Sequence, residues 1–481
     1  MQPLFFMAFC LSWIFSTHLS LLVAQERPNI LFLFADDFTY EAVSAFGHTD
    51  IDTPNLDRLA KRGTTFTHAY NMGGWNGAVC VASRNMLLTG RSIWRAEAIA
   101  NATESERKLG KLWPQLLSAG GYDTYMTGKW HIQANAEKTF DIARHVRAGM
   151  PGTVNASYNR PLAGQPDPWS ASDKSLGGFW EGGKHWSEVG ADDAIDFLAT
   201  AKDNSNPFFM YIAFNAPHDP RQSPQEYLDK YPVERIQTPA SFQGLYPYKD
   251  KIGCGPSLRD EKLAPFPRTE AAIKVHRREY YALITHLDAQ VGRILAALEA
   301  TGKADNTWIF FTADHGLAVG NHGLVGKQNM YEHSLRVPFI AVGPSAKSGK
   351  QIAAPIYLQD VMATSLELAK VPKPETCEFH SLMPLLAGTC EESNYHSIYG
   401  CYINLQRCVI HDGWKLIVYP DAKVTRLYDL NRDPLELKDL SGDPTQSERK
   451  QQLFLRLREL QTEYADKLDL KSRFGFNSSE N

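Results

Sequence analysis

Segment 29–35 reads Asn-Ile-Leu-Phe-Leu-Phe-Ala and ends directly at two acids, Asp36 and Asp37. A short apolar run without alternating polar residues is typical of a strand buried on both faces of a parallel sheet. Stretches long enough for crossover helices separate it from three similar runs, at 208–214, 308–312 and 337–342. This arrangement predicts an α/β fold with a central, mostly parallel sheet flanked by helices.

A long amphipathic helix is expected between residues 271 and 300, where apolar side chains recur every three or four positions. Ligands of open parallel sheets bind at the carboxyl ends of the strands. Because Asp36 and Asp37 directly follow the first predicted strand, we expect the functional site at that edge of the sheet.

The length and composition fit a two-part soluble protein. The chain has 481 residues, of which 43% are hydrophobic and 22% charged, so a full core can form. A formal net charge of -4 lacks the basic field that a nucleic-acid backbone requires, and nucleic acid is not an expected partner.

The chain changes character after Pro372, where short strands are predicted at 408–411, 414–419 and 426–430. A charged amphipathic helix is predicted from about 448 to 467. We therefore expect a smaller antiparallel sheet with one helix. The predicted division is a signal peptide over 1–24, a main domain over 25–374 and a C-terminal subdomain over 375–481.

Residues 4–24 are strongly apolar and are followed by Gln-Glu-Arg, which is typical of a secretory signal. The protein is therefore predicted to be secreted or periplasmic, with no stable membrane partner. An uncleaved anchor is the alternative, since about 20 apolar residues can span a bilayer.

Six of the seven cysteines follow that segment, and four of them cluster late in the chain. In an oxidising compartment, disulfides among Cys377, Cys390, Cys401 and Cys408 are plausible, with three connectivities open. Cys80 stands apart from this group.

Segment 80–84 reads Cys-Val-Ala-Ser-Arg, and Thr-Gly-Arg follows at 89–91. This pattern resembles the signature of the formylglycine-dependent sulfatases, members of the alkaline phosphatase superfamily, although Ala82 replaces the commoner proline. The resemblance implies that a formylglycine-generating enzyme oxidises Cys80 to formylglycine, whose hydrate provides a nucleophile. On its own, so short a match fits a buried cysteine at a helix start equally well.

Two acidic motifs extend the resemblance to a metal site. Asp36-Asp37 is similar to the paired acids of the family, and 313–316, Ala-Asp-His-Gly, is similar to the motif that completes its calcium site. The implied calcium ligands are Asp36, Asp37, Asp314, His315 and the residue at position 80. Carboxylates at neighbouring strand ends repel one another unless a hard cation lies between them. His315 occupies a position that is often asparagine in the family, and imidazole is an unusual calcium ligand.

Three further motifs occur in the family's order, namely Gly-Lys-Trp-His at 128–131, Ala-Pro-His at 216–218 and Gly-Lys at 326–327. The resemblance implies that Lys129 contacts the sulfate and that His131 acts on the formylglycine hydrate. It places His218 beside the leaving-group oxygen and makes Lys327 the second active-site lysine.

A sulfate monoester needs these residue types because its negative charge repels a nucleophile. Arg84, Lys129, Lys327 and the cation would neutralise that charge. His218, aided by Lys327, would protonate the departing alcohol, and His131 would take a proton from the remaining hydroxyl.

Segments 414–416, 427–430 and 433–434 also resemble the closing subdomain of the family. The resemblance thus covers nearly the whole mature chain and implies an alkaline-phosphatase-like core. Its implied activity is hydrolysis of a sulfate monoester on a sugar or polysaccharide. The candidate sugar contacts are Trp75 and six residues of the Gly-, Pro- and Trp-rich segment 151–190, namely Trp169, Phe179, Trp180, Lys184, His185 and Trp186.

Two other functions remain open from the sequence. A phosphate or phosphonate monoester hydrolase would share the metal cradle, and relative turnover of aryl sulfate and aryl phosphate separates the two. A non-catalytic carbohydrate-binding protein would retain Cys80 as a thiol.

Overall fold

The computed structural model describes residues 27–47 and 50–474, so the predicted signal peptide lies outside the described residues. Its main feature is an eight-stranded sheet with the order β11-β2-β10-β8-β1-β7-β5-β6. The strands are β1 (Asn29–Ala35), β2 (Thr64–Phe66), β5 (Asp123–Lys129), β6 (Ile142–Arg147), β7 (Phe208–Ala213), β8 (Thr307–Ala313), β10 (Phe339–Val342) and β11 (Lys350–Ile352).

Strand β1 lies at the centre, parallel to β7 on one side and to β8 on the other. Phe34 pairs with Ala213 in β7 and with Thr312 in β8, so the three strands end at the same edge of the sheet. All three are buried along their whole length, as their apolar runs predict.

The predicted strand 337–342 is divided at Pro338. Strand β9 (Arg336–Val337) precedes this proline, and β10 follows it and runs antiparallel to β8. Proline has no backbone N–H to donate to a sheet ladder, which explains the division.

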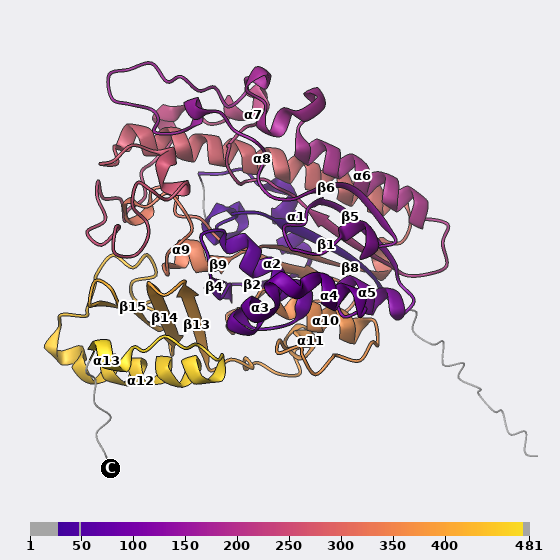
Figure 1. The fold of residues 1–481 in the computed structure, drawn as a ribbon. Helices are drawn as coiled ribbons and strands as arrows, with labels where there is room; N and C mark the ends of the chain where they lie inside the picture. The colour runs from indigo at the N-terminus through magenta and orange to yellow at the C-terminus, as the bar shows by residue number, and fades with distance from the viewer. Residues whose placement is uncertain (1–26, 48–49, 475–481) are drawn as a thin grey trace, which may run out of the picture.

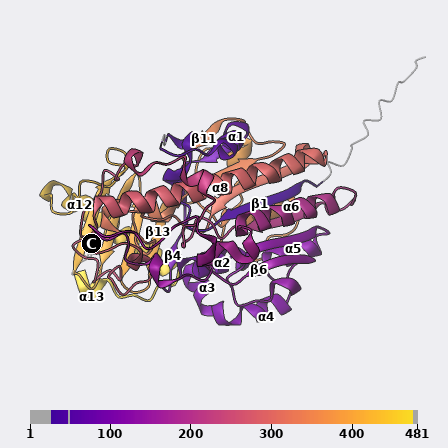
Figure 2. The same ribbon diagram turned by 90° about the horizontal axis from the view of Figure 1, so that it is seen from above.

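Helices cover both faces of the large sheet (Figures 1 and 2). The long α8 (Glu270–Ala300) and α6 (Trp186–Ala201) lie on one face, and α5 (Trp113–Ala119) and α10 (Asp360–Leu368) lie on the other. Trp113 fixes α5 to the sheet, because its ring centroid lies 5.2 Å from that of Phe32 and 4.8 Å from that of Phe209.

A five-stranded sheet, β16-β15-β14-β13-β4, lies at one end of the molecule (Figure 1). It contains β4 (Gly73–Gly74), β13 (Ser397–Tyr402), β14 (Gln406–His411), β15 (Trp414–Tyr419) and β16 (Val424–Asp429), and α12 (Ser447–Glu463) packs on it. The predicted antiparallel sheet and helix are confirmed. The sequence missed two of its strands, β13 and β4, and β4 comes from the N-terminal half and pairs parallel with β13.

A small third sheet, β12-β3-β9, joins these parts. The remaining elements are β3 (Ala69–Tyr70), β12 (Ile356–Tyr357), α1 (Pro54–Arg62), α2 (Val79–Thr89), α3 (Ile93–Ile99), α4 (Thr103–Lys108), α7 (Gln225–Leu228), α9 (Glu332–Leu335), α11 (Met383–Ala387) and α13 (Lys471–Phe474). Within residues 27–47 and 50–474, no helix has the length and apolar character needed to cross a bilayer.

The predicted disulfides among the late cysteines are absent, since every cysteine in the described ranges is free. The register of β13 and β14 explains this for one pair, because Cys401 lies opposite Arg407 and Cys408 lies opposite Gly400. Successive residues of a strand point to opposite faces, so the two thiols do not face each other.

Lys415 of β15 connects the small sheet to the main body. Its buried Nζ lies 2.8 Å from Glu332 Oε1 on α9 and 2.8 Å from Glu436 Oε1. Because Lys415 is the nearest cation to both buried carboxylates, losing it would leave buried negative charge with less compensation away from water.

We expect Lys415→Ala to lower the free energy of unfolding by about 3–5 kcal/mol, as for other broken buried ion pairs. Urea unfolding followed by circular dichroism measures the change. Lys438→Ala, which alters an exposed lysine of the same subdomain, serves as the control. Equal stability of the two variants would contradict the proposed connection.

Candidate active site

Four adjacent parallel strands, β8, β1, β7 and β5, end at the same edge of the sheet and deliver most of the predicted site residues. Asp36 and Asp37 follow β1, and Asp314 and His315 follow β8. His218 follows β7, while Lys129 is the last residue of β5 and His131 comes just after it. The close approach of β5 to β7 needs Gly128, because a Cβ there would lie 1.9 Å from the carbonyl oxygen of Ala213.

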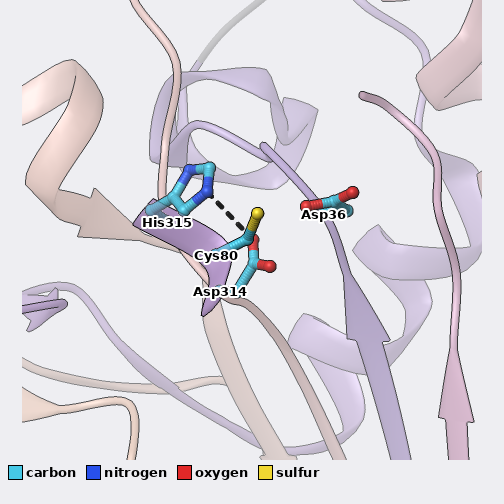
Figure 3. Close-up of side chains that lie close together, drawn as sticks. All are labelled: Asp36, Cys80, Asp314 and His315. Atoms are coloured by element: carbon cyan, nitrogen blue, oxygen red, sulfur yellow. Dashed lines mark ion pairs between the residues drawn. The ribbon is translucent and has the colours of Figure 1, made fainter. Parts of the chain in front are cut away.

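Helix α2 brings Cys80 and Arg84 to the same place. Ligand atoms of Asp36, Cys80, Asp314 and His315 all lie within 4.8 Å of one another, and all four residues are buried. Figure 3 shows these side chains gathered together, with Asp314 and His315 from one segment and Cys80 from the helix. Asp37 belongs to a second such group, with Asp36 and His218.

This arrangement fits a cation. Asp36 Oδ1 is buried without a hydrogen-bond partner in the described residues, and the buried His315 Nε2 lies 3.2 Å from Asp37 Oδ1 and 3.5 Å from Asp314 Oδ1. His315 Nδ1–H donates to the carbonyl oxygen of Gly316 at 2.9 Å, so Nε2 faces the carboxylates, where either a proton or a metal ion can occupy it. The set of carboxylate oxygens suits a hard cation such as calcium.

The pKa values of these groups reflect the same concentration of charge. Burial raises the pKa of Asp37, and the neighbouring His218 and Lys327 offset this only in part. The pKa of His315 rises to about 9, because Asp314 and Asp37 outweigh the effect of burial. The space between these carboxylates thus attracts positive charge, whether a proton or a metal ion.

Three buried cations border the carboxylates. Lys129 Nζ pairs with Asp36, and Lys327 Nζ lies 2.9 Å from both carboxylate oxygens of Asp37. Arg84 Nε donates to Asp314 Oδ2 at 3.0 Å and its Nη1 donates to the carbonyl oxygen of Lys129 at 2.8 Å. Arg84 Nη2 is buried without a partner in the described residues, so it retains a donor for an anion.

Cys80 lies near the start of α2, with its Sγ 3.4 Å from His131 Nδ1. Burial alone would raise the pKa of this thiol, but Lys129 and Lys327 hold it well below its usual value. A side chain at this position therefore lies in a strongly electropositive environment that also favours a bound anion.

His218 is held at both ring nitrogens. Its Nδ1 lies 2.8 Å from the carbonyl oxygen of Asp219 and 3.1 Å from the Asp219 carboxylate, and its Nε2 lies 3.1 Å from Lys327 Nζ. Arg259 Nη1 pairs in turn with Asp219 Oδ2 at 2.6 Å. His218 is thereby oriented with Nε2 toward the carboxylates of the site.

Asp219 and Arg259 are site residues that the sequence motifs do not include. Asp219 could have been found, since an acid directly after a predicted catalytic histidine can orient its ring. Arg259 lies in an irregular stretch before the 3-10 turn 260–263, and no sequence pattern points to it.

Four of the seven predicted sugar contacts, Trp169, Phe179, Trp180 and His185, are wrong because their side chains are buried, whereas Trp75, Lys184 and Trp186 stay predictions. Trp169, Phe179 and Trp180 are at most 7% exposed and pack the insertion loop onto the body. His185 is buried and caps α6, Trp186 begins that helix under the guanidinium of Arg147, and Lys184 pairs with Asp192. Trp75 differs, because it borders a hollow of about 630 Å³ that His131 also lines.

Comparison with known proteins agrees with this geometry. The sequence model of the family described as "Sulfatase" matches residues 28–371, and that of "N-sulphoglucosamine sulphohydrolase, C-terminal" matches 320–463. The chain therefore belongs to the sulfatase family, and it is an enzyme of the sulfuric ester hydrolase class.

Among curated relatives, an N-acetylglucosamine-6-O-sulfatase of Bacteroides thetaiotaomicron is 27% identical, covering 92% of this chain and 87% of the relative. An arylsulfatase of Clostridium perfringens is 28% identical, covering 88% and 92%. A protein solved in complex with its substrate, D-glucosamine-2-N,6-O-disulfate, has a TM-score of 0.72 at 25% identity, covering 93% of this chain and all of that one.

Asp219→Asn is expected to lower kcat for an aryl sulfate by about 10- to 100-fold, because small displacements of a catalytic group cost that much. KM and the thermal midpoint should change little if Asp219 positions His218. Steady-state kinetics and thermal unfolding measure the three quantities. Asp203→Asn, at an exposed position, is the control. A lowered thermal midpoint with unchanged kcat would indicate a purely structural role.

Proposed function

We propose that the protein hydrolyses a sulfate monoester on a sugar or polysaccharide, with formylglycine at position 80 and one calcium ion. The observation that carries this proposal is the position of Cys80. Its ligand atom lies within 4.8 Å of those of Asp36, Asp314 and His315, and Lys129 and Lys327 both act electrostatically on the same thiol. A nucleophile placed there would meet an anionic substrate inside a ring of positive charge.

Asp36, Asp37, Asp314 and His315, with the residue at 80, would hold the calcium ion, which would supply positive charge to stabilise the anionic substrate. Two observations support this assignment: Asp36 Oδ1 is buried without a hydrogen-bond partner in the described residues, and His315 Nε2 lies among the carboxylates, 3.2 Å from Asp37 Oδ1. With Asp36 and Asp37 engaged by the ion, Lys129 and Lys327 are free to act on the substrate.

Formylglycine supplies a hydroxyl nucleophile from its hydrated aldehyde. Arg84, through its unpartnered Nη2, and Lys129 bind the sulfate oxygens and orient the sulfur. His218, with Lys327 3.1 Å from its Nε2, gives a proton to the departing alcohol oxygen. His131, whose Nδ1 lies 3.4 Å from the side chain at position 80, takes a proton from that residue.

A sulfated sugar is the proposed substrate class, supported by the sulfated glucosamine bound by the similar structure and by the name of the Bacteroides thetaiotaomicron relative. We propose the same division as the sequence predicts, with a catalytic domain over 25–374 and a subdomain over 375–481. We also propose that segment 1–24 directs export and that a formylglycine-generating enzyme modifies Cys80.

A phosphonate monoester hydrolase of Agrobacterium radiobacter shares the fold, with a TM-score of 0.69 at 20% identity. Phosphate and sulfate esters differ in charge, and three cationic side chains together with the proposed calcium ion would tolerate either. The decisive experiment compares kcat/KM for an aryl sulfate and an aryl phosphate with the same leaving group. We expect the sulfate to be preferred, and a large preference for phosphate would overturn the proposal.

Cys80→Ala is expected to abolish turnover of the aryl sulfate, by about a thousandfold or more, because the nucleophile is lost. The thermal midpoint should be retained, since the change removes one small side chain. Mass spectrometry of the wild-type peptide containing residue 80 should show an aldehyde. An intact thiol in active protein would show that the nucleophile has been misassigned.

Calcium added to chelator-treated protein should raise its thermal midpoint, because a ligand bound only by the folded state stabilises it by about 2.7 kcal/mol at 100 times its Kd. Asp36→Asn should abolish that rise. Magnesium is the control, since it demands stricter octahedral geometry and should act more weakly. Equal midpoints with and without calcium would exclude the assigned site.

A further inference from the structure

A second hollow lies beside the one that His131 lines. The first, of about 630 Å³, is also lined by Val81, the neighbour of Cys80, and by Trp75. The second, of about 560 Å³, is lined by Trp75 and Trp94 together with Glu97, Asn404, Arg407 and Lys467. The two hollows therefore meet at Trp75, which lies on the loop between β4 and α2, five positions before Cys80.

Trp94, on α3, is held rigidly in the wall of the second hollow. Its Nε1–H donates to the hydroxyl of Tyr399 at 3.0 Å, and that hydroxyl donates to Asp466 Oδ2 at 2.9 Å. Asp466 also binds the guanidinium of Arg407, which lies 4.8 Å from the centre of the Trp94 ring. The indole is thus oriented before any ligand arrives, which lowers the entropy lost on binding.

The lining combines two partly exposed indoles with exposed polar groups at the rim, namely Glu97, Asn404 and Lys467. A sugar ring presents the matching chemistry, with C–H groups on its face and hydroxyls at its edge. Aromatic side chains offer an apolar face to such a ring. A carboxylate and an amide can bind the hydroxyls, and a lysine can bind an acidic substituent.

We propose that this second hollow is an outer sugar-binding subsite. Its occupant is a neighbouring unit of the same anionic carbohydrate chain whose sulfated unit lies at Cys80, and the chain passes Trp75 between the two. The inference rests on the proposed function and extends it, because it makes an oligosaccharide or polysaccharide the substrate. It also assigns a role to the C-terminal subdomain, which supplies Asn404, Arg407 and Lys467.

The test compares a small and an extended substrate. An aryl sulfate reaches only the first hollow, whereas sulfated di-, tetra- and hexasaccharides prepared from chondroitin sulfate, heparan sulfate and carrageenan reach the second. Wild-type kcat/KM is measured on each series, together with that of Trp94→Ala and Lys467→Ala. Trp414→Ala is the matched control, because Trp414 is also partly exposed under an arginine, Arg449, but lines neither hollow.

We expect wild-type kcat/KM to rise with chain length in at least one series. Trp94→Ala should lower kcat/KM for the longer members by about tenfold, or about 1.4 kcal/mol, because the apolar face offered to the sugar ring is lost. Lys467→Ala should have a smaller effect in the same direction, and neither variant should change turnover of the aryl sulfate. Because Lys467 is exposed, its variant remains informative if loss of the Trp94–Tyr399 hydrogen bond impairs folding.

Three results would contradict the subsite. The first is equal wild-type kcat/KM on short and long oligosaccharides. The second is a variant that loses as much kcat/KM on the aryl sulfate as on the oligosaccharides, and the third is oligosaccharide kcat/KM that neither variant changes. Failure of the proposed function is distinguishable, because the wild-type protein would then hydrolyse neither the aryl sulfate nor any sulfated sugar.

Discussion

Three buried carboxylates at the ends of two adjacent strands impose the central constraint on this structure. Asp36 and Asp37 end β1, and Asp314 ends β8, so the parallel register brings like charges together away from water. Burial of such a group is costly unless it is paired. Lys129, Lys327 and Arg84 provide that pairing in the described residues.

The compensating cations come from distant parts of the chain, which explains much of the architecture. Arg84 arrives on α2, Lys129 on β5 and Lys327 on the loop before α9. Each must be buried to neutralise its carboxylate, so the surrounding loops pack closely over the strand ends. Asp36 Oδ1 and Arg84 Nη2, two site atoms that have no hydrogen-bond partner in the described residues, are then suited to a cation and to an anion respectively. A buried polar group without a hydrogen-bond partner lowers the free energy of unfolding, and such groups are found chiefly at functional sites.

Much of the fold followed from local pattern. The apolar runs predicted β1, β7 and β8 to within a residue or two, and the apolar spacing predicted α8, because burial on both faces or on one stripe has a characteristic period. The predicted helix 448–467 ends earlier, at Glu463, and the strand 337–342 is divided at Pro338. Strand β4 was missed because two glycines carry no periodic signal, and its pairing with β13 spans more than 300 positions.

The sequence by itself determined the kinds of residues in the site and their order along the chain, since the short motifs around Cys80, Asp36 and Asp314 are local. Only the tertiary structure decided which side chains share one space, because that depends on strand order and register. Asp219 and Arg259 belong to the site because of such contacts. Trp169, Phe179 and Trp180, which the sequence placed on a sugar-binding surface, are buried. Trp94 and Trp75 line the same hollow for the same reason, because its walls come from segments that meet only when the chain has folded.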